Sequence, residues 1–132
     1  MRITYKDSMD IKAEDLSKVF LASGIKRPYE DLERLQRMIN NADIIITAWE
    51  DEKLIGIARA VTDYAYCCYL SDLAVDKQYQ KCGIGEQLIL RVRGKIGEEC
   101  SLVLLSAPGA INYYPKVGFT QADNAFVIKR GK

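Results

Sequence analysis

The residues with the clearest chemical potential are two glycines, Gly83 and Gly85, in the segment Gln80–Gly85 (QKCGIG). They follow a short apolar run, Tyr69–Val75, and they precede an amphipathic segment that begins at Ile84. A strand, a tight loop with two glycines and then a helix form an arrangement suited to phosphate. The glycines let backbone N–H groups turn toward one point, and the helix N-terminus adds a partial positive charge. The loop therefore predicts an anion site, although two glycines alone do not identify the anion.

The composition limits the classes of protein to which this chain can belong. Its 132 residues fit one domain, residues 1–132, and the apolar and charged fractions of 48% and 28% are those of an ordinary soluble globular protein. The net charge of +1, with both signs interspersed, argues against a general nucleic-acid binder. No apolar run approaches the roughly 20 residues that cross a bilayer. The polar N-terminus does not resemble a signal peptide, so we expect a cytoplasmic protein that does not bind membranes.

The four cysteines do not predict a metal site. Cys67, Cys68, Cys82 and Cys100 have no C-x-x-C spacing, and the chain contains no histidine. We therefore expect reduced thiols and no bound metal. Cys82 lies near a predicted helix N-terminus beside Lys81, which favours a lowered thiol pKa, but no histidine base is available to assist it as a nucleophile.

Hydrophobic periodicity predicts the elements that position the glycine loop. We expect strands at residues 3–5, 44–49, 54–61, 66–75 and 101–105, the last buried on both faces, and a weak final strand at 125–129. We expect helices at residues 13–22, 28–39, 84–96 and 108–114, with Pro28 in the first turn of the second. This order predicts an α+β fold: a mixed sheet, made of an antiparallel meander followed by a β-α-β crossover, with helices on both faces. The link Ser23–Tyr29 is either the edge of a substrate pocket or a surface loop.

Two segments of the chain resemble the GCN5-related N-acetyltransferase (GNAT) family. In the family the loop signature is Gln/Arg-x-x-Gly-x-Gly/Ala, and Gln80, Gly83 and Gly85 fill it. A later family pattern, Ala-x-x-Phe/Tyr-Tyr-x-Lys-x-Gly-Phe, is matched at Ala110, Tyr113, Tyr114, Lys116, Gly118 and Phe119. The two matches occur in the family's order with a strand between them. The resemblance covers roughly residues 69–119 with specific motifs, and it departs from many members at Ala107, where they carry an asparagine.

The resemblance implies a GNAT-like mixed sheet and a single acyl-CoA N-acyltransferase domain. It implies transfer of an acetyl group from acetyl-CoA, as co-substrate and without a metal, to a primary amine of a small molecule or a protein amino group. The pyrophosphate suits the N–H groups of the glycine loop, and the pantetheine arm suits the backbone where two strands diverge. The residues expected to bind the coenzyme are Leu73, Ala74, Val75, Gln80, Lys81, Cys82, Gly83, Ile84, Gly85 and Glu86.

The resemblance also implies two catalytic residues. Tyr114 matches the tyrosine that protonates the leaving thiolate in many members, and a tyrosine hydroxyl is protonated at neutral pH. Without a histidine, the base is Asp72, beside Leu73, or a carboxylate acting through ordered water. The alternatives to a catalytic role for Asp72 are a structural hydrogen-bonding role or an exposed position, because strand alternation does not establish which way its side chain points.

Other readings belong to different classes of protein. A catalytically silent acyl-CoA-binding or regulatory module on the same fold is the principal alternative. The chain lacks the G-x-x-x-x-G-K-[ST] loop of a nucleoside triphosphatase. It also lacks the G-x-G-x-x-G motif and the alternating parallel sheet of a nicotinamide-binding domain. The short chain suggests a compact pocket or one completed by a second subunit, hence a possible homodimer. Some acidic residues either attract a cationic amine or are solvated surface charges: Glu14, Glu30, Asp31 and Asp63.

Overall fold

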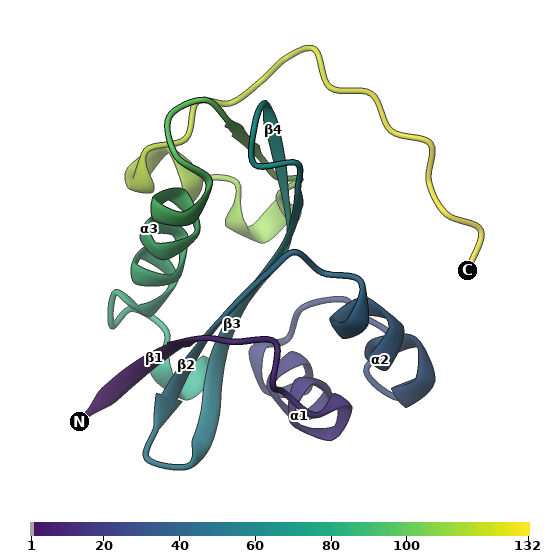
Figure 1. Ribbon diagram of the computed structural model, residues 1–132, viewed down its shortest axis with the longest axis vertical. Helices are drawn as coiled ribbons and strands as arrows, with labels where there is room; N and C mark the ends of the chain where they lie inside the picture. Colours follow the sequence, from purple (N-terminus) through teal and green to yellow (C-terminus); the bar gives the residue numbers. More distant parts are fainter. Residues whose placement is uncertain (1) are drawn as a thin grey trace.

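A computed structural model describes residues 2–132, and it is built around one five-stranded sheet (Figure 1). The strands lie side by side in sequence order, β1-β2-β3-β4-β5, with β5 parallel to β4 and all other neighbours antiparallel. Their bounds are β1 Ile3–Asp7, β2 Ile44–Glu50, β3 Lys53–Thr62, β4 Cys67–Val75 and β5 Ser101–Val103. The α+β prediction is confirmed: an antiparallel meander leads through a helix into a parallel fifth strand.

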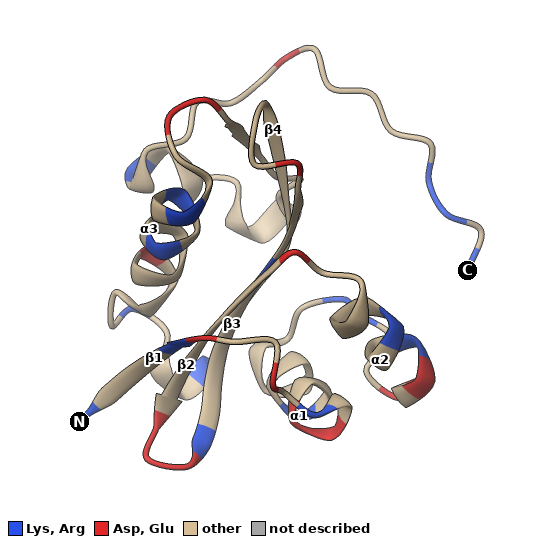
Figure 2. Cartoon of the chain, in the orientation of Figure 1, with Lys and Arg blue, Asp and Glu red and all other residues tan. Residues whose placement is uncertain are grey.

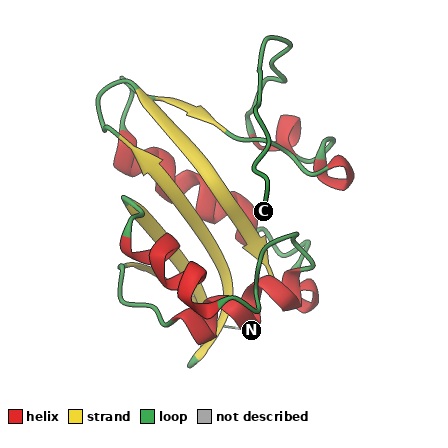
Figure 3. Ribbon diagram, turned by 90° about the vertical axis from the view of Figure 1, so that its right-hand side faces the viewer, coloured by secondary structure: helices red, strands yellow, loops and turns green. Residues whose placement is uncertain are grey.

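Helices cover both faces of the sheet, as predicted. Helices α1 (Ala13–Ser23) and α2 (Leu32–Asn40) lie on one face and α3 (Ile84–Ile96) lies on the other (Figures 1 and 3). Each face has its own apolar core. The α3 side buries Leu88, Ile89 and Val92 against the sheet, and the α1–α2 side buries a cluster around Leu16 and Phe20.

Local chemistry explains where the first two helices end and begin. Gly24 ends α1 with a φ of 80°, a left-handed conformation that favours glycine. The helix predicted from Pro28 begins later, at Leu32, because the Asp31 side chain accepts a hydrogen bond from the Arg34 N–H and caps the helix there. Pro28 instead lies in the turn before the cap, where its carbonyl accepts from the Asp31 N–H.

The parallel pair β4–β5 is short, and this shapes the molecule. The two strands pair only at Cys67↔Ser101, Cys68↔Leu102 and Tyr69↔Val103. Beyond Tyr69, β4 continues to Val75 beside β3 without pairing with β5. The predicted strand at residues 101–105 is therefore wrong in length. It is also wrong in burial, since Val103 and Leu105 are half exposed.

The C-terminal part of the chain departs from the prediction at two points. The helix expected at residues 108–114 is replaced by two 3-10 turns, η2 (Pro108–Ala110) and η3 (Tyr114–Val117). The expected strand at 125–129 does not form: the tail extends away from the sheet (Figure 1), and Phe126 and Ile128 are 96% and 100% exposed. Within residues 2–132, no helix combines the length and apolarity needed to cross a membrane.

Candidate functional site

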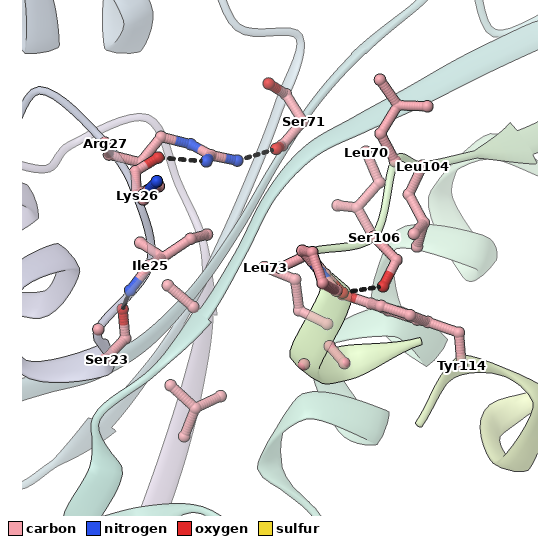
Figure 4. A pocket seen from close by; sticks show the side chains of 18 of the residues that line it. Ser23, Ile25, Lys26, Arg27, Leu70, Ser71, Leu73, Leu104, Ser106 and Tyr114 are labelled. Atoms are coloured by element: carbon pink, nitrogen blue, oxygen red, sulfur yellow. Dashed lines mark hydrogen bonds between the residues drawn. The ribbon is translucent and has the colours of Figure 1, made fainter. Parts of the chain in front are cut away.

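A cavity of about 580 Å³ opens where β4 and β5 separate. Its walls come from five parts of the chain: the link after α1, the second half of β4, the glycine loop at Gln80, the segment that follows β5, and the tail. Figure 4 shows side chains of the link on one side and Tyr114 with the leucines of β4 and the segment after β5 on the other. Residues Ser23–Arg27 of the link all line this cavity, and that a substrate binds here stays a prediction.

The second half of β4 presents a free backbone edge to the cavity. Leu73, Ala74 and Val75 line it, and each pairs with β3 on its other side. Because β5 leaves the sheet after Val103, nothing in the sheet pairs with this edge of the three residues. An extended amide-bearing molecule can add to such an edge by main-chain hydrogen bonds.

The glycine loop lies directly after β4 and starts α3. Gly83 is the residue before the helix, with a left-handed φ of 79°, and Lys81 also has a positive φ of 67°. The first backbone bond of the helix runs from the Gln87 N–H to the Gly83 carbonyl, 3.1 Å, so the N–H groups of Ile84, Gly85 and Glu86 have no acceptor within the helix. These donors and the helix dipole form an anion-binding arrangement.

Gln80 connects this loop to the free strand edge. Its side-chain amide donates to the Val75 carbonyl at 2.9 Å, and Gln80 itself lines the cavity. Cys82 is an exposed free thiol in the loop, and the other three cysteines are free as well. The loop and the cavity are therefore neighbouring parts of one surface.

The two matched sequence segments touch each other at Gly85. A Cβ atom built on Gly85 would lie 2.7 Å from the Tyr113 hydroxyl oxygen, closer than real Cβ contacts. Only glycine therefore lets the tyrosine hydroxyl approach the first turn of α3 this closely. Burial raises the pKa of Tyr113, and the neighbouring Tyr114 and Glu86 act in the same direction.

Tyr114 lies in the wall of the cavity, in the turn that follows Tyr113. Its ring packs edge-on between Tyr113, 5.2 Å away, and Phe119, 5.5 Å away. Such T-shaped contacts fix the ring plane. Burial raises the pKa of the Tyr114 hydroxyl from 10.0, against a weaker opposing effect of Arg27. The hydroxyl is therefore protonated across the physiological range.

Asp72 does not join Tyr114 in the cavity. The side chain is fully buried and does not line the cavity, unlike its neighbours Ser71 and Leu73. Its two oxygens accept from Arg27 Nε at 2.6 Å and from Arg59 Nε at 2.5 Å. Both carboxylate oxygens are therefore engaged by arginine donors, and the group does not face the cavity. This geometry is that of the structural hydrogen-bonding alternative, and it does not support the predicted role of base.

Arg27 holds the link against β4 through the same ion pair. Besides Asp72, it donates to the Lys26 carbonyl and, through its Nη2, to the Ser71 carbonyl, both at 2.6 Å (Figure 4). Arg59 adds a 3.0 Å hydrogen bond to the Ser71 hydroxyl. Sequence reasoning missed both arginines, because nothing in their local sequence marks them as partners of a residue on β4.

The acidic residues considered as an attraction for a cationic amine are not at the site. None of Glu14, Glu30, Asp31 and Asp63 lines the cavity. Asp63 instead accepts backbone N–H groups of Ala65, Tyr66 and Cys67 in the turn before β4. Those bonds lower its pKa to about 2.

Comparison with known proteins finds relatives within one protein family. A model of the acetyltransferase (GNAT) domain matches residues 11–130. A GCN5-related chloroplastic N-acetyltransferase of Arabidopsis thaliana is 30% identical over 118 residues, which are 83% of this chain and 56% of that protein. The chain thus spans a little over half the length of this curated relative.

Solved structures share the fold at lower sequence identity. A protein of unknown function from methicillin-resistant Staphylococcus aureus, described as a probable acetyltransferase, has a TM-score of 0.84 at 21% identity, covering 98% of this chain and all of that one. An aminoglycoside acetyltransferase from an uncultured soil metagenomic sample, solved with sisomicin, has a TM-score of 0.65 at 21% identity, with 97% and 95% covered.

Proposed function

The chain belongs to the GNAT acetyltransferase family, and from this premise we propose that it transfers an acetyl group from acetyl-CoA to a primary amine. The observation that carries the proposal is the wedge between β4 and β5. There, one cavity meets a free strand edge, a glycine loop with unpaired helix N–H groups, and a half-buried, protonated tyrosine. A purely structural domain has no need of these three features in one place.

The chain's own groups fit a thioester of coenzyme A. The N–H groups of Ile84, Gly85 and Glu86 suit the pyrophosphate, while Gln80, Lys81, Cys82 and Gly83 shape the loop that presents them. The edge at Leu73, Ala74 and Val75 suits the pantetheine amides. A backbone N–H of this edge can polarise the thioester carbonyl, an interaction worth about 3 kcal/mol in the transition state.

The chemical step is a direct attack with Tyr114 as the acid. The amine nitrogen bonds to the thioester carbonyl carbon and the C–S bond breaks, with the electron pair leaving on sulfur. Tyr114 gives its proton to that thiolate. The new amide nitrogen loses its extra proton to water, and the tyrosinate takes a proton back from solvent. Because its pKa is raised, Tyr114 stays protonated until the C–S bond breaks and the thiolate forms.

No base is required in the cavity if the amine arrives neutral. The titratable side chains that line it are Lys26, Arg27, Tyr114 and Arg130, with no carboxylate among the described residues of the lining. We assign Asp72 a positioning role: it holds Arg27, and with it the link that forms the acceptor side of the cavity.

Replacing Tyr114 by phenylalanine tests the acid assignment. The ring and its two aromatic contacts remain, and only the hydroxyl is lost. General acids typically contribute 10²- to 10⁴-fold, so we expect kcat to fall by about 100-fold or more while the calorimetric Kd of acetyl-CoA changes less than about threefold. Wild-type kcat in this variant would refute the assignment.

The silent-module alternative makes a different forecast for the wild-type chain. It expects calorimetric binding of acetyl-CoA and no release of free thiol with any amine of a broad panel. Thiol release with one competent amine would exclude it.

A further inference from the structure

The charged side chains that line the cavity all carry positive charge. They are Lys26 and Arg27 of the link and Arg130 of the tail, and no Asp or Glu from residues 2–132 lines it with them. Figure 2 shows the same cationic link before α2 and cationic residues near the end of the tail. The remaining lining is mainly apolar, with leucines at positions 70, 73, 104 and 105.

Two of these charges are not neutralised within the protein. The side chains of Lys26 and Arg130 make no ion pair or hydrogen bond with another residue between 2 and 132. Arg27 is paired with Asp72, but that single carboxylate also pairs with Arg59, so the group of three keeps a formal net charge of +1. A cleft lined by one sign of charge concentrates ligands of the opposite sign.

We infer that the acceptor is a small primary amine that carries a carboxylate, and that Lys26 and Arg130 bind this carboxylate. The inference rests on the proposed acetyl transfer and names its substrate class. The link side of the cavity is the natural place for the acceptor, because the opposite wall is formed by the free strand edge and Tyr114 (Figure 4). The same charges repel a polycationic amine. The inferred acceptor therefore differs from an aminoglycoside such as the sisomicin bound to the structurally similar enzyme.

The cationic lining also serves the reaction. The attacking amine must be neutral, and nearby positive charge disfavours an ammonium ion relative to the free amine. A carboxylate that pairs with Lys26 and Arg130 anchors the molecule, while the amine loses its proton more easily than in water. This accounts for a site in which no carboxylate side chain is available as a base.

A matched series of acceptors tests the inference directly. 4-Aminobutyrate, butylamine and 1,4-diaminobutane share a four-carbon chain and differ in whether the far end is anionic, neutral or cationic. With the full chain and saturating acetyl-CoA, we expect kcat/KM from thiol release to be at least about tenfold higher for 4-aminobutyrate than for 1,4-diaminobutane. Glycine against glycinamide repeats the comparison at a shorter spacing. The inference would be overturned if 1,4-diaminobutane were at least as good an acceptor as 4-aminobutyrate and glycinamide at least as good as glycine.

Charge-removing variants locate the effect. Lys26→Gln with Arg130→Gln should reduce the anionic preference to less than about a third of its wild-type ratio. Lys18→Gln with Lys129→Gln is the matched control: it removes the same two charges from exposed positions outside the cavity lining, and it should keep the wild-type ratio.

A further outcome separates the acceptor from the coenzyme. If the double variant weakens calorimetric binding of acetyl-CoA and leaves the acceptor ratio unchanged, the cations serve the coenzyme phosphates and the inference is wrong. Failure of the wild-type chain to bind acetyl-CoA at all would instead refute the proposed function. The two failures are therefore distinguishable by one binding measurement.

Discussion

The contact between Gly85 and Tyr113 makes a sharp prediction, because a single methyl group tests how the two matched segments fit together. In Gly85→Ala the new Cβ would lie 2.7 Å from the Tyr113 hydroxyl oxygen and 3.5 Å from the ring carbon that bears it. The first distance requires a shift, whereas the second is ordinary van der Waals contact. The hydroxyl alone is therefore the obstacle, and the tyrosine must turn away to accommodate alanine.

The magnitude follows from two opposing effects on the free energy of unfolding. Alanine in place of glycine inside a helix stabilises by up to about 1 kcal/mol. Overpacking a tightly filled site costs about 1–3 kcal/mol. We expect Gly85→Ala to change stability by between about 0 and −2 kcal/mol. The displaced ring also disturbs Tyr114, which packs 5.2 Å from it, so kcat should fall as well.

The other glycine within α3, Gly94, provides the control. A Cβ there meets nothing within 4 Å. Gly94→Ala should therefore show the helix gain alone, about 0.5–1 kcal/mol. Urea denaturation of both variants, with constant m-values, measures the difference.

A double variant decides whether the hydroxyl is the cause. In a Tyr113→Phe background the clashing oxygen is absent, so Gly85→Ala should become stabilising, as at Gly94. The coupling energy between the two sites should then be about 1–3 kcal/mol. Equal effects of Gly85→Ala with and without the Tyr113 hydroxyl would refute the reasoning.

Three further predictions concern pH and the tail. The acid limb of kcat/KM should follow the pKa of each acceptor amine rather than a fixed enzyme group. Any alkaline loss should have its midpoint above pH 10, because burial raises the pKa of Tyr114 from 10.0. Asp63→Asn should lower stability at pH 7, and the difference from wild type should vanish as pH falls from 3.8 through about 2, since the folded carboxyl has the lowered pKa; urea denaturation across this range measures it. Phe126→Ser with Ile128→Ser should change the unfolding free energy by less than about 0.5 kcal/mol, because both side chains are almost fully exposed. A larger loss in a concentration-dependent melt would show that the tail packs against a second copy.

The parts of the fold predicted correctly are those with strong local signals. The apolar period of α3 and the glycines that end α1 and α3 are signals carried by neighbouring residues. The predicted bounds of both helices therefore match the observed ones within a residue or two. The glycine loop was located for the same reason, since strand, turn and helix signals all lie between Tyr69 and Ile84.

The errors arose where tertiary contacts decide the outcome. The run at residues 101–105 is apolar enough for a buried strand, but β5 leaves β4 after Val103 and the leucines that follow line a cavity instead. Apolar periodicity reports that a residue is covered, and it does not report whether a sheet neighbour or a ligand covers it. The tail has strand-like residues at 125–129, yet no sheet hydrogen bonds hold it within this chain.

Asp72 shows how a site can be misassigned and still be informative. The residue is on the expected strand, and its neighbours Ser71 and Leu73 do line the cavity, so only the direction of its side chain differs from the role of base. Both oxygens of its buried carboxylate are engaged by Arg27 and Arg59, so Asp72 holds the cationic link in place. Under the proposed mechanism, the acceptor then has to arrive as a free amine. A positively charged cavity favours that form, and under the inference drawn above the acidic group that pairs with this cavity belongs to the acceptor.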